Sequence, residues 1–582
     1  MTDLLADLDP EPDQRLVLGP LLRHVDETTA TIWVETASAG RVTVDASGHR
    51  AEAPTFSVHG HHYALVWLEG LAPGQKYPYT VTIDGLQVWP LEDSPYPPSL
   101  IPTLDHGKPL RLAFGSCRTS VSHDEAGNRK HGVDALRAYA LRMAGITDGS
   151  HPDDPDPGGE VRWPDMVLFL GDQVYADETT EEMRQFIEAR RDIEEPPGEE
   201  LKDYQEYAEL YRIAWTDPAN RWLLSTVPSA MIFDDHDIRD DWNTSLSWKR
   251  EMEATEWWHE RIVTGLASYW VYQHLGNLTP AEREEDEPWQ QILGHAKEVG
   301  DGEEYDATDL LRALAEKADQ EPTTYRWSYC RDFGEQARLL VVDSRAARVL
   351  DPERRAMLDD DEMAWFDERM TGGFEHVLVG SSLPFLLSPG LHYVEAFSEA
   401  LASGGWGKGL GAKAGEALRQ HVDLEHWAAF QKGFQQVCDI VLEVLRGKRG
   451  PTPRTVTFLG GDVHHSYVSE ARPKEGEPIH GRFIQAVCSP IRNPLPRAVR
   501  FATAALSYGV AGPIGHVVAA SAKVPNAPVS WRLLEGPWFD NNIATLEVRP
   551  GEGLRMWWGT GEVENGDHER PRFAQVEEVL VT

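Results

Sequence analysis

The stretch from Asp165 to Asp177, DMVLFLGDQVYAD, constrains the fold more than any other part of the sequence. Residues 166–171 are apolar or small, which predicts a short strand that is buried on both faces. Polar and ionisable side chains follow directly: Asp172, Gln173, Tyr175 and Asp177. Doubly buried strands are typical of layered α/β proteins, which bind ligands beyond the carboxyl ends of their strands. The stretch therefore predicts an α/β fold with a candidate site at Asp172.

Three further apolar runs end in the same abrupt way. LRLAFGSC ends at Cys117, and ionisable residues follow the runs PSAMIF and RTVTFLGG: Asp234, Asp235, His236 and Asp237 after the first, and Asp462, His464 and His465 after the second. Each motif alone is more often structural, because a lone Cys after a strand usually packs as a small apolar side chain. The carboxyl ends of strands in a layered α/β fold face one crevice, so all the motifs can meet there. We therefore predict a single site built from several strand ends.

The sequence before residue 104 has a different pattern. ATIWVET, GRVTVDA and HYALVWLEG alternate apolar and polar residues between turn signals, which predicts an all-β sandwich over residues 15–103. This segment resembles an immunoglobulin or fibronectin-like module, and we expect a structural appendage that caps the rest of the protein. The remaining sequence is predicted to form an acidic tail and a large α/β domain, at residues 1–14 and 104–582.

Further elements are expected within the large domain. ARLLVVDSR and FEHVLVGSS predict buried strands, while NNIATLEVRP and GLRMWWGTG predict an antiparallel pair near the end of the sequence. Helical insertions are expected at about 178–222, 249–322 and 392–446. The second insertion is strongly acidic, and we expect it to be a surface excursion rather than part of the core.

Residues 501–522 contain no Asp, Glu, Lys or Arg. The segment is long enough to span a bilayer, but its many Gly, Ala and Ser residues are poorly suited to that purpose. We expect a buried helix pair or a lid over the site, with membrane contact as the alternative.

Net charge and cysteine content restrict the partners and the compartment. The chain carries 95 acidic and 55 basic residues, for a net charge of −40, which repels nucleic acid and anionic membranes at long range. We therefore expect no nucleic acid as a stable partner, whereas an anionic substrate requires metal ions or a local Arg to reverse the field. The four Cys are widely spaced and no signal segment is evident, so a cytoplasmic location is expected. The oligomeric state is not predicted.

The side chains at the strand ends suit a metal centre. A thiolate, a phenol and few imidazoles favour iron over a plain zinc site, and the surplus carboxylate oxygens suit a harder ion such as calcium. Two cations that share a carboxylate can polarise a phosphoryl group, generate hydroxide and stabilise the leaving oxygen. Asp172 is the candidate for the shared ligand. Neither a G-x-S-x-G elbow nor a P-loop competes with this interpretation.

Five motifs together carry a family resemblance. GSC (115–117), GDQVYAD (171–177), FDDHDIRDDWN (233–243), SSLPFLLSPGLHYVEAF (381–397) and GGDVHHS (460–466) resemble the PhoD-like alkaline phosphatase/phosphodiesterase family of metallophosphatases. The resemblance implies a four-layer α/β/β/α sandwich behind the β-domain. It also implies hydrolysis of small phosphate esters by a metal-activated hydroxide. The implied metals are Fe³⁺ and Ca²⁺, with Mn²⁺, Zn²⁺ or Mg²⁺ as alternatives.

The resemblance also assigns roles to residues. It implies the metal ligands Cys117, Asp172, Tyr175, Asp235, Asp462 and His464. His236 and Asp235 are the implied catalytic residues. The sequence departs from the family pattern at Asp240 and Asp241, where members commonly carry two Asn residues. The twin-Arg signal of secreted members is also absent from this sequence.

Four other residues beside the motifs are candidates with open alternatives. Arg118, as a catalytic residue, and Arg239 are candidates to clamp a phosphate through two parallel hydrogen bonds. The alternative is that both form ion pairs with the many nearby acids. His392 contacts the substrate or only packs in its helix. His465 supports a neighbouring ligand and the substrate, or points away. A competing hypothesis for the whole chain is a non-catalytic, metal-stabilised or membrane-associated scaffold.

Overall fold

The computed structural model describes residues 15–147, 162–299, 304–402, 425–496, 500, 515, 517, 519–522 and 524–581. The expected acidic tail at residues 1–14 and most of the expected lid at residues 501–522 lie outside these ranges. Within the described ranges, no helix combines the length and the apolar character that crossing a membrane requires.

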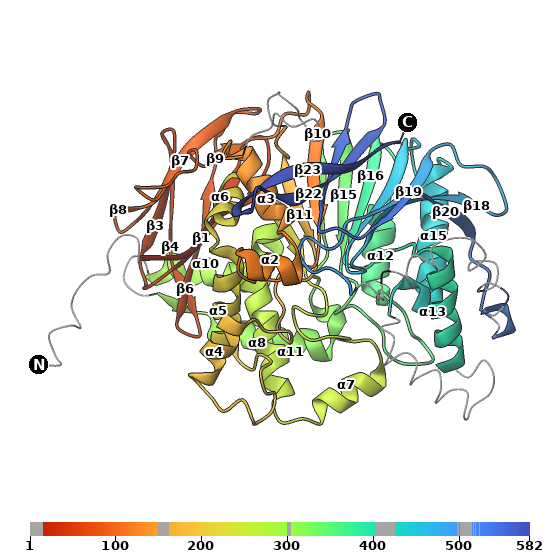
Figure 1. Cartoon of the computed structure of the whole chain (residues 1–582), viewed down its shortest axis with the longest axis horizontal. Helices are drawn as coiled ribbons and strands as arrows, with labels where there is room; N and C mark the ends of the chain where they lie inside the picture. The colour runs from red at the N-terminus through yellow and green to blue at the C-terminus, as the bar shows by residue number, and fades with distance from the viewer. Residues whose placement is uncertain are drawn as a thin grey trace, which may run out of the picture.

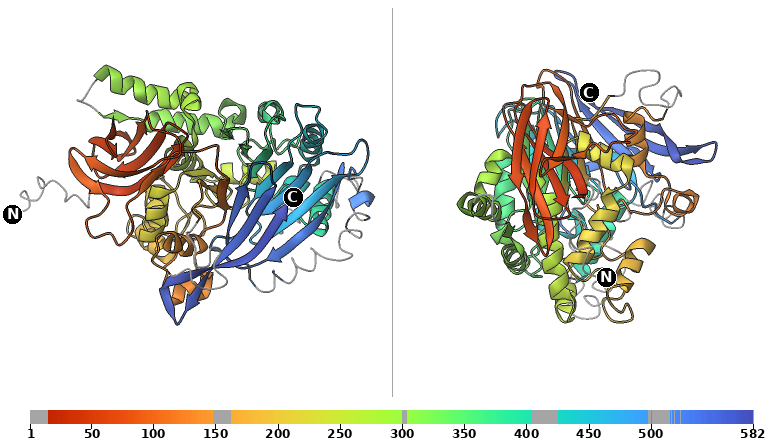
Figure 2. Two further views of the ribbon diagram at one scale, coloured as in Figure 1. Left: turned by 90° about the horizontal axis from the view of Figure 1, so that it is seen from above. Right: turned by 90° about the vertical axis from the view of Figure 1, so that its left-hand side faces the viewer.

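The N-terminal region is all-β, as predicted (Figure 2). One sheet contains β1 (Leu16–Val25), β2 (Ala30–Thr36), β6 (His61–Leu68) and β5 (Phe56–Val58). The other contains β4 (His49–Pro54), β3 (Arg41–Ala46), β7 (Lys76–Ile83) and β8 (Leu86–Trp89), with β9 (Leu100–Pro102) paired to β7. Side chains from both sheets, such as Ile32 and Val81, share one buried cluster. This domain is therefore a sandwich whose two sheets are held together by apolar packing.

The first central sheet has the order β12-β11-β10-β21-β22-β23. Its parallel half is built from predicted strands: β10 (Leu110–Gly115), β11 (Met166–Leu170) and β12 (Ser229–Ile232). Its antiparallel half comes from the end of the chain: β21 (Ile543–Val548), β22 (Leu554–Glu564) and β23 (Asp567–Val581). The predicted antiparallel pair is confirmed, and β23 adds a third strand to it.

The second central sheet has the order β14-β15-β16-β17-β19-β18-β20. Its parallel core is β15 (Ala337–Val342), β16 (His376–Ser381), β17 (Thr455–Gly460) and β19 (Arg482–Val487). The flanking strands are antiparallel to their neighbours: β14 (Tyr329–Phe333), β18 (Ser466–Pro473) and β20 (Val529–Trp538). The strands predicted from ARLLVV, HVLVGS and TVTFLG are all confirmed and are entirely or almost entirely buried.

The two central sheets face each other with little space between them. A Cβ added to Gly380 of β16 would lie 3.2 Å from Leu170 and 3.3 Å from Leu168 of β11. Helices cover the outer faces: α3 (Ala135–Met143) contacts β22 and β23, while α12 (Asp360–Arg369) and α15 (Gln431–Leu445) lie on the second sheet (Figure 1). The predicted α/β/β/α order of layers is confirmed.

The predicted insertions are mainly helical. The first contains α4 (Glu181–Glu188), α5 (Tyr204–Trp215) and α6 (Pro218–Thr226), after α2 (Glu125–His131) at the start of the domain. The third contains α13 (Pro389–Ala402) and the turn η4 (Trp427–Ala429) before α15. The second contains α7 (Leu246–Glu253), α8 (Trp258–Tyr269), η1 (Trp270–His274), η2 (Leu275–Asn277), α9 (Pro280–Glu285), α10 (Glu287–Val299), β13 (Tyr305–Asp306), α11 (Thr308–Gln320) and η3 (Pro322–Thr324).

The prediction that residues 249–322 form a surface excursion is wrong for their central part. Residues 261–278 are buried, since α8 and the π-helical turn η1 are apolar or uncharged on nearly every face. In addition, β13 pairs with β5 and so extends a sheet of the N-terminal domain. The acidic composition of the whole insertion suggested an exposed segment, but its charged residues are concentrated on α7 and on α9 to α11 rather than on the buried central part.

The contact between the two central sheets leads to a testable prediction. Gly380→Leu adds a side chain where Leu168, Leu170 and Val341 leave no room, and overpacking of this kind costs about 1–3 kcal/mol. We expect a lower midpoint of thermal unfolding, measured by circular dichroism. Gly294→Leu in α10 is the control, because a Cβ there meets no atom within 4 Å. An equal loss in both variants would contradict the close packing at Gly380.

Candidate metal centre

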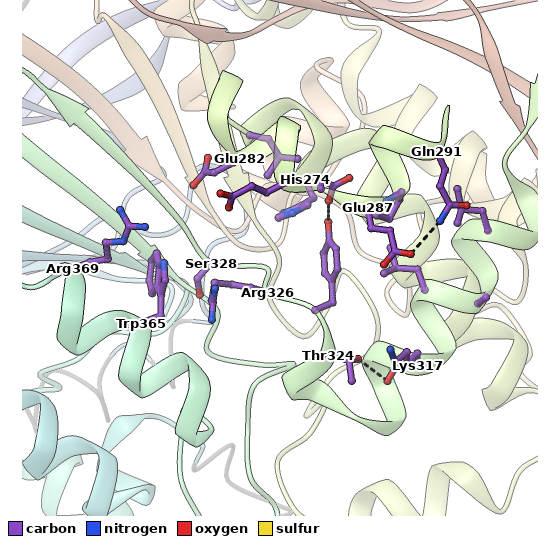
Figure 3. Close-up of a pocket in the computed structure, with 18 residues that line it drawn as sticks. His274, Glu282, Glu287, Gln291, Lys317, Thr324, Arg326, Ser328, Trp365 and Arg369 are labelled. Carbon is purple, nitrogen blue, oxygen red and sulfur yellow. Dashed lines mark hydrogen bonds between the residues drawn. The ribbon is translucent and has the colours of Figure 1, made fainter. Parts of the chain in front are cut away.

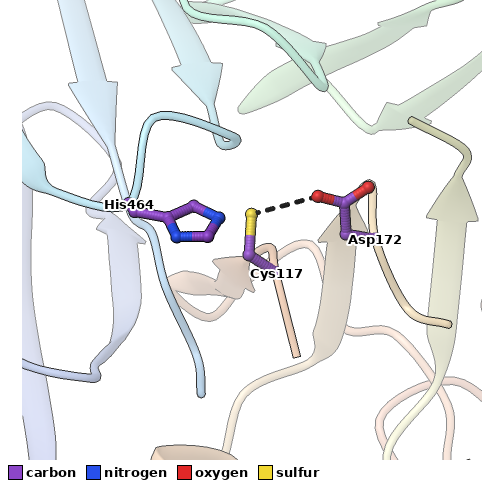
Figure 4. Close-up of side chains that lie close together, drawn as sticks. All are labelled: Cys117, Asp172 and His464. Atoms are coloured by element: carbon purple, nitrogen blue, oxygen red, sulfur yellow. Dashed lines mark hydrogen bonds between the residues drawn. The ribbon is translucent and has the colours of Figure 1, made fainter. Parts of the chain in front are cut away.

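Loops that follow three of the predicted strands converge on one point (Figure 4). Cys117 follows β10, Asp172 follows β11 and His464 follows β17, and each offers a ligand atom within 4.8 Å of the other two. Cys117 Sγ lies 3.4 Å from Asp172 Oδ2. Residues that are far apart in the sequence are therefore neighbours, which is the juxtaposition that the strand ends predict.

A second group of ligand atoms shares one member with the first. Carboxylate oxygens of Asp172, Asp234, Asp235 and Asp462 also lie within 4.8 Å of one another. Asp172 is thus the only residue common to both groups among the described part of the chain. A third group, of Asp235, His236 and Asp240, adjoins the second through Asp235.

Tyr175 and His236 form one wall of this centre. Their ring centroids are 4.8 Å apart. Burial raises the pKa of Tyr175 well above its usual value, and the nearby Cys117 and Asp172 raise it further. His236 Nδ1 lies 2.9 Å from Asp177 Oδ1. Asp177 also accepts a hydrogen bond from the Asp240 backbone, so its carboxylate holds the ring and the loop rather than standing free for a metal.

The backbone at the strand ends adopts an uncommon conformation. Cys117, Asp172, Asp462 and His464 have φ angles of 57°, 50°, 61° and 50°. Such left-handed conformations of residues other than Gly cost of order 1–3 kcal/mol each and gather at functional sites. At Gly171, where φ is 95°, a Cβ would lie 2.5 Å from that of Asp234, so only Gly fits between these loops.

The buried carboxylates of the centre fit a cation. Burial raises the pKa of Asp172 and Asp235 well above the usual range, and raises that of Asp234 to about 6. Asp172 Oδ1 and Asp234 Oδ2 are buried and have no hydrogen-bond partner among the described residues. Orphaned oxygens of this kind are expensive unless a cation or a donor satisfies them. The donor set therefore fits one or more metal ions.

Arg345 supplies positive charge to the same carboxylates. Its guanidinium is fully buried, contacts Asp234 and Glu425, and places Nη2 3.0 Å from Asp235 Oδ1. The loop that carries it is fixed by Asp343, whose carboxylate accepts the backbone N–H groups of residues 345–347. Sequence reasoning missed Arg345, although it follows a buried strand as the other site residues do.

His426 is a second residue that the sequence did not reveal. Nε2 lies 3.0 Å from Asp462 Oδ2, and Nδ1 lies 2.6 Å from Glu395 Oε1. Burial lowers the pKa of His426, but Glu395 and Asp462 outweigh it and hold the pKa well above its usual value. The imidazolium thus orients Asp462, in the manner of residues that orient metal ligands. No strand-end pattern marks this position.

The two Arg candidates form ion pairs with acidic residues outside the groups of ligand atoms. Arg118 Nη2 lies 2.8 Å from Asp134 Oδ2, and Nη1 donates to Ala214 O at 2.9 Å. Arg239 Nε lies 3.0 Å from Glu200 Oε2. Both guanidinium groups are therefore held in ion pairs, which was the alternative to the phosphate clamp. A paired guanidinium has few donors left for a substrate, and the phosphate clamp stays a prediction.

The rings of the two further His candidates pack against aromatic side chains. The ring of His392 packs against Phe434 and Trp531, with centroid distances of 4.8 and 4.7 Å. The ring of His465 stacks on Tyr467 at 5.3 Å. Burial lowers the pKa of His392 to about 3 and that of His465 to about 4, so both are neutral. Neither ring belongs to the groups of candidate ligand atoms found among the described residues, and their assignment to the substrate stays a prediction.

A separate cavity of about 560 Å³ lies among α9, α10, α11 and α12 (Figure 3). Trp365, Arg326 and Lys317 line it, together with acidic residues of α9 and α10. None of the grouped ligand residues lines this cavity. It therefore belongs to a different part of the molecule from the strand-end cluster.

The ion pairs of Arg345 generate a prediction. Arg345→Met leaves Asp234, Asp235 and Glu425 buried without their cation, and breaking a buried pair in this way costs about 3–5 kcal/mol. We expect a large loss of thermal stability in metal-stripped protein. Arg354→Met is the control, because the Arg354–Asp360 pair is exposed and contributes about 0–1 kcal/mol. Equal stability of the two variants would mean that Arg345 does not neutralise the centre.

Comparison with known proteins identifies the family. A model described as PhoD-like phosphatase matches residues 160–517, and one described as a domain of unknown function (DUF7800) matches residues 13–101. None of the curated proteins compared matches the chain. A solved structure described as "Structure of PhoD" aligns with 98% of this chain and 91% of its own, with a TM-score of 0.56 and 12% identity. That identity shows a shared fold alone. The phosphatase model spans more than half of the 582 residues, so the chain belongs to the PhoD-like phosphatase family.

Proposed function

We propose that the protein hydrolyses small phosphate esters at a metal centre formed by the strand-end loops. Membership of the PhoD-like phosphatase family supports phosphatase activity in general. Metal dependence is supported by a largely buried cluster, in which Asp172 belongs both to a thiol–imidazole–carboxylate group and to a four-carboxylate group. Asp172 Oδ1 and Asp234 Oδ2 in this cluster are buried without a hydrogen-bond partner among the described residues. Burying such oxygens costs free energy unless a cation compensates their charge.

The ligand atoms divide into two candidate sites. Cys117, Asp172 and His464, which share one group of ligand atoms, would hold one ion, together with Tyr175 and Asp462 as the family resemblance implies. Once deprotonated by the ion, the thiol and the phenol favour Fe³⁺ over Mn²⁺, Zn²⁺ or Mg²⁺. Asp172 and Asp235, with Asp234 beside them, would hold a second and harder ion such as Ca²⁺. Bound cations supply Lewis acidity, which polarises a phosphoryl oxygen and makes a water molecule a better nucleophile.

The chain's own residues would orient the substrate and move protons. Asp177 holds His236 through Nδ1, so that Nε2, 3.9 Å from Oδ1 of the exposed Asp240 side chain, is the ring nitrogen left for a substrate. His236 Nε2 is therefore the proposed donor to a phosphoryl or leaving oxygen. Arg345 removes part of the negative charge that would otherwise repel an anionic ester from a chain with a net charge of −40.

The choice between monoester and diester substrates is tested directly. p-Nitrophenyl phosphate and bis-p-nitrophenyl phosphate carry the same leaving group and differ in the charge and bulk at phosphorus. Comparing kcat/KM for the two assigns the purified protein to one class or to both. Absence of turnover on either ester would favour the competing scaffold hypothesis.

The proposed shared ligand predicts the effect of one substitution. Asp172→Asn removes a charge from both ligand groups, so we expect turnover to fall by more than about a hundredfold while the far-ultraviolet circular dichroism is unchanged. Asp165→Asn is the matched control, because Asp165 stands just before β11, at the opposite end of the strand. A folded Asp172→Asn protein with full activity would refute the shared role.

The proposed Fe³⁺ ligands predict a colour. A phenolate bound to Fe³⁺ gives a visible charge-transfer band, so the iron-loaded protein should be yellow to purple and Tyr175→Phe should lose the band. Tyr467→Phe is the control, because its hydroxyl donates to Leu386 O and not to the cluster. Metal analysis of the same samples measures iron directly. A colourless, metal-free and inactive parent protein would refute the proposed metal-dependent hydrolysis.

A further inference from the structure

Asp237 lies beneath the metal centre and joins two of its loops. Its Oδ2 accepts hydrogen bonds from the backbone N–H groups of Asp172 at 2.9 Å and Asp234 at 2.8 Å. The side chain is buried, and it belongs to none of the groups of candidate ligand atoms. Because Asp172 and Asp234 are the first polar residues after β11 and β12, one carboxylate fixes the spacing between these strand ends.

The other oxygen of Asp237 is held by Gln273. Gln273 Nε2 donates to Asp237 Oδ1 at 3.0 Å and contacts Tyr211 Oη at the same distance. Gln273 lies in the π-helical turn η1. Single π-turns are rare and occur frequently at functional sites, because they redirect the side chains of a helix. In this turn Tyr272, the residue before Gln273, points to the β-domain and donates to Glu35 Oε2 at 2.9 Å.

Arg23 of β1 anchors the same turn to the N-terminal domain. Its guanidinium is fully buried and donates to Tyr272 O at 2.8 Å, to Gln273 O at 2.6 Å and to Asn277 Oδ1 at 3.1 Å. The fit is tight, since a Cβ on Gly276 would collide with the guanidinium. A continuous chain of hydrogen bonds and covalent structure thus leads from the β-domain through Gln273 and Asp237 to Asp172.

We infer that Asp237 is a positioning residue for the metal-binding loops, and that the β-domain holds it in place through Arg23 and Gln273. The inference rests on the proposed metal centre. It gives the N-terminal domain a part in the site, where the sequence predicted only a structural appendage. Residues that orient metal ligands typically contribute 10–100-fold to metal affinity, so the effect is large enough to measure.

Substitutions at Asp237 separate positioning from ligation. Asp237→Ala removes the acceptor of both backbone N–H groups, so the affinity of metal-stripped protein for Mn²⁺ alone should fall by about 10–100-fold. Asp237→Asn should restore the affinity to within a few-fold. An Asn oxygen accepts the same two bonds, and Gln273 Oε1, which has no partner among the described residues, accepts from the Asn amide after a flip. Free Mn²⁺ is measured by electron paramagnetic resonance.

The part played by the β-domain needs a second pair of variants. Arg23→Met should weaken Mn²⁺ binding by about tenfold or more, because it releases the turn that carries Gln273. Arg221→Met is the matched control: Arg221 Nε also crosses to the β-domain, at 2.6 Å from Gly19 O, but its contact does not lead to Asp237. If Arg23→Met does not fold, Gln273→Met tests the same link.

These measurements distinguish failure of the inference about Asp237 from failure of the proposed function. A parent protein that binds no metal overturns the metal centre and this inference together. A parent that binds Mn²⁺ while Asp237→Ala binds equally well overturns only the inference. Loss of affinity in Asp237→Asn as severe as in Asp237→Ala would show that Asp237 is a ligand, not a positioning residue. Equal effects of Arg23→Met and Arg221→Met would show that the β-domain does not position Asp237 through Arg23.

Discussion

Several carboxylates gather at one point inside the protein, and the surrounding structure must hold them there. Asp172, Asp234 and Asp235 are buried, and Asp462 beside them is half-buried. Like charges so close together repel strongly in a medium of low dielectric constant. Arg345 neutralises part of this charge, and His426 holds Asp462 from the other side. The remaining negative charge and the orphaned oxygens are what a metal centre requires.

Such repulsion must be resisted by the scaffold. Strand ends of two sheets supply the side chains, and the left-handed backbone at Cys117, Asp172, Asp462 and His464 shows that their directions are imposed rather than relaxed. Backbone hydrogen bonds from Cys117 to Gly171 and from Arg118 to Asp172 tie one loop to the next. The β-domain adds support from below through a buried Arg and a π-helical turn.

The sequence predicted those features that leave a local signal. Apolar runs located the buried strands, and the abrupt change to ionisable residues located Cys117, Asp172 and His464 at their ends. Interactions between distant segments left no such signal. Arg345 follows a buried strand but has no cluster of ionisable neighbours like those of Asp172 or Asp234, and His426 follows no strand. Only the tertiary packing brings them to Asp235 and Asp462. Proximity in sequence does not fix the direction of a side chain: Arg118 follows a ligand candidate directly, yet its guanidinium pairs with Asp134.

Diffraction at the iron absorption edge can show whether metal ions occupy the strand-end cluster. We expect an anomalous peak between the ligand atoms of Cys117, Asp172 and His464 in crystals of the protein purified without chelators. A second, lighter ion is expected beside Asp172 on the side of Asp234 and Asp235. A well-ordered cluster without anomalous density or any bound cation, in crystals grown from catalytically active protein, would contradict the account.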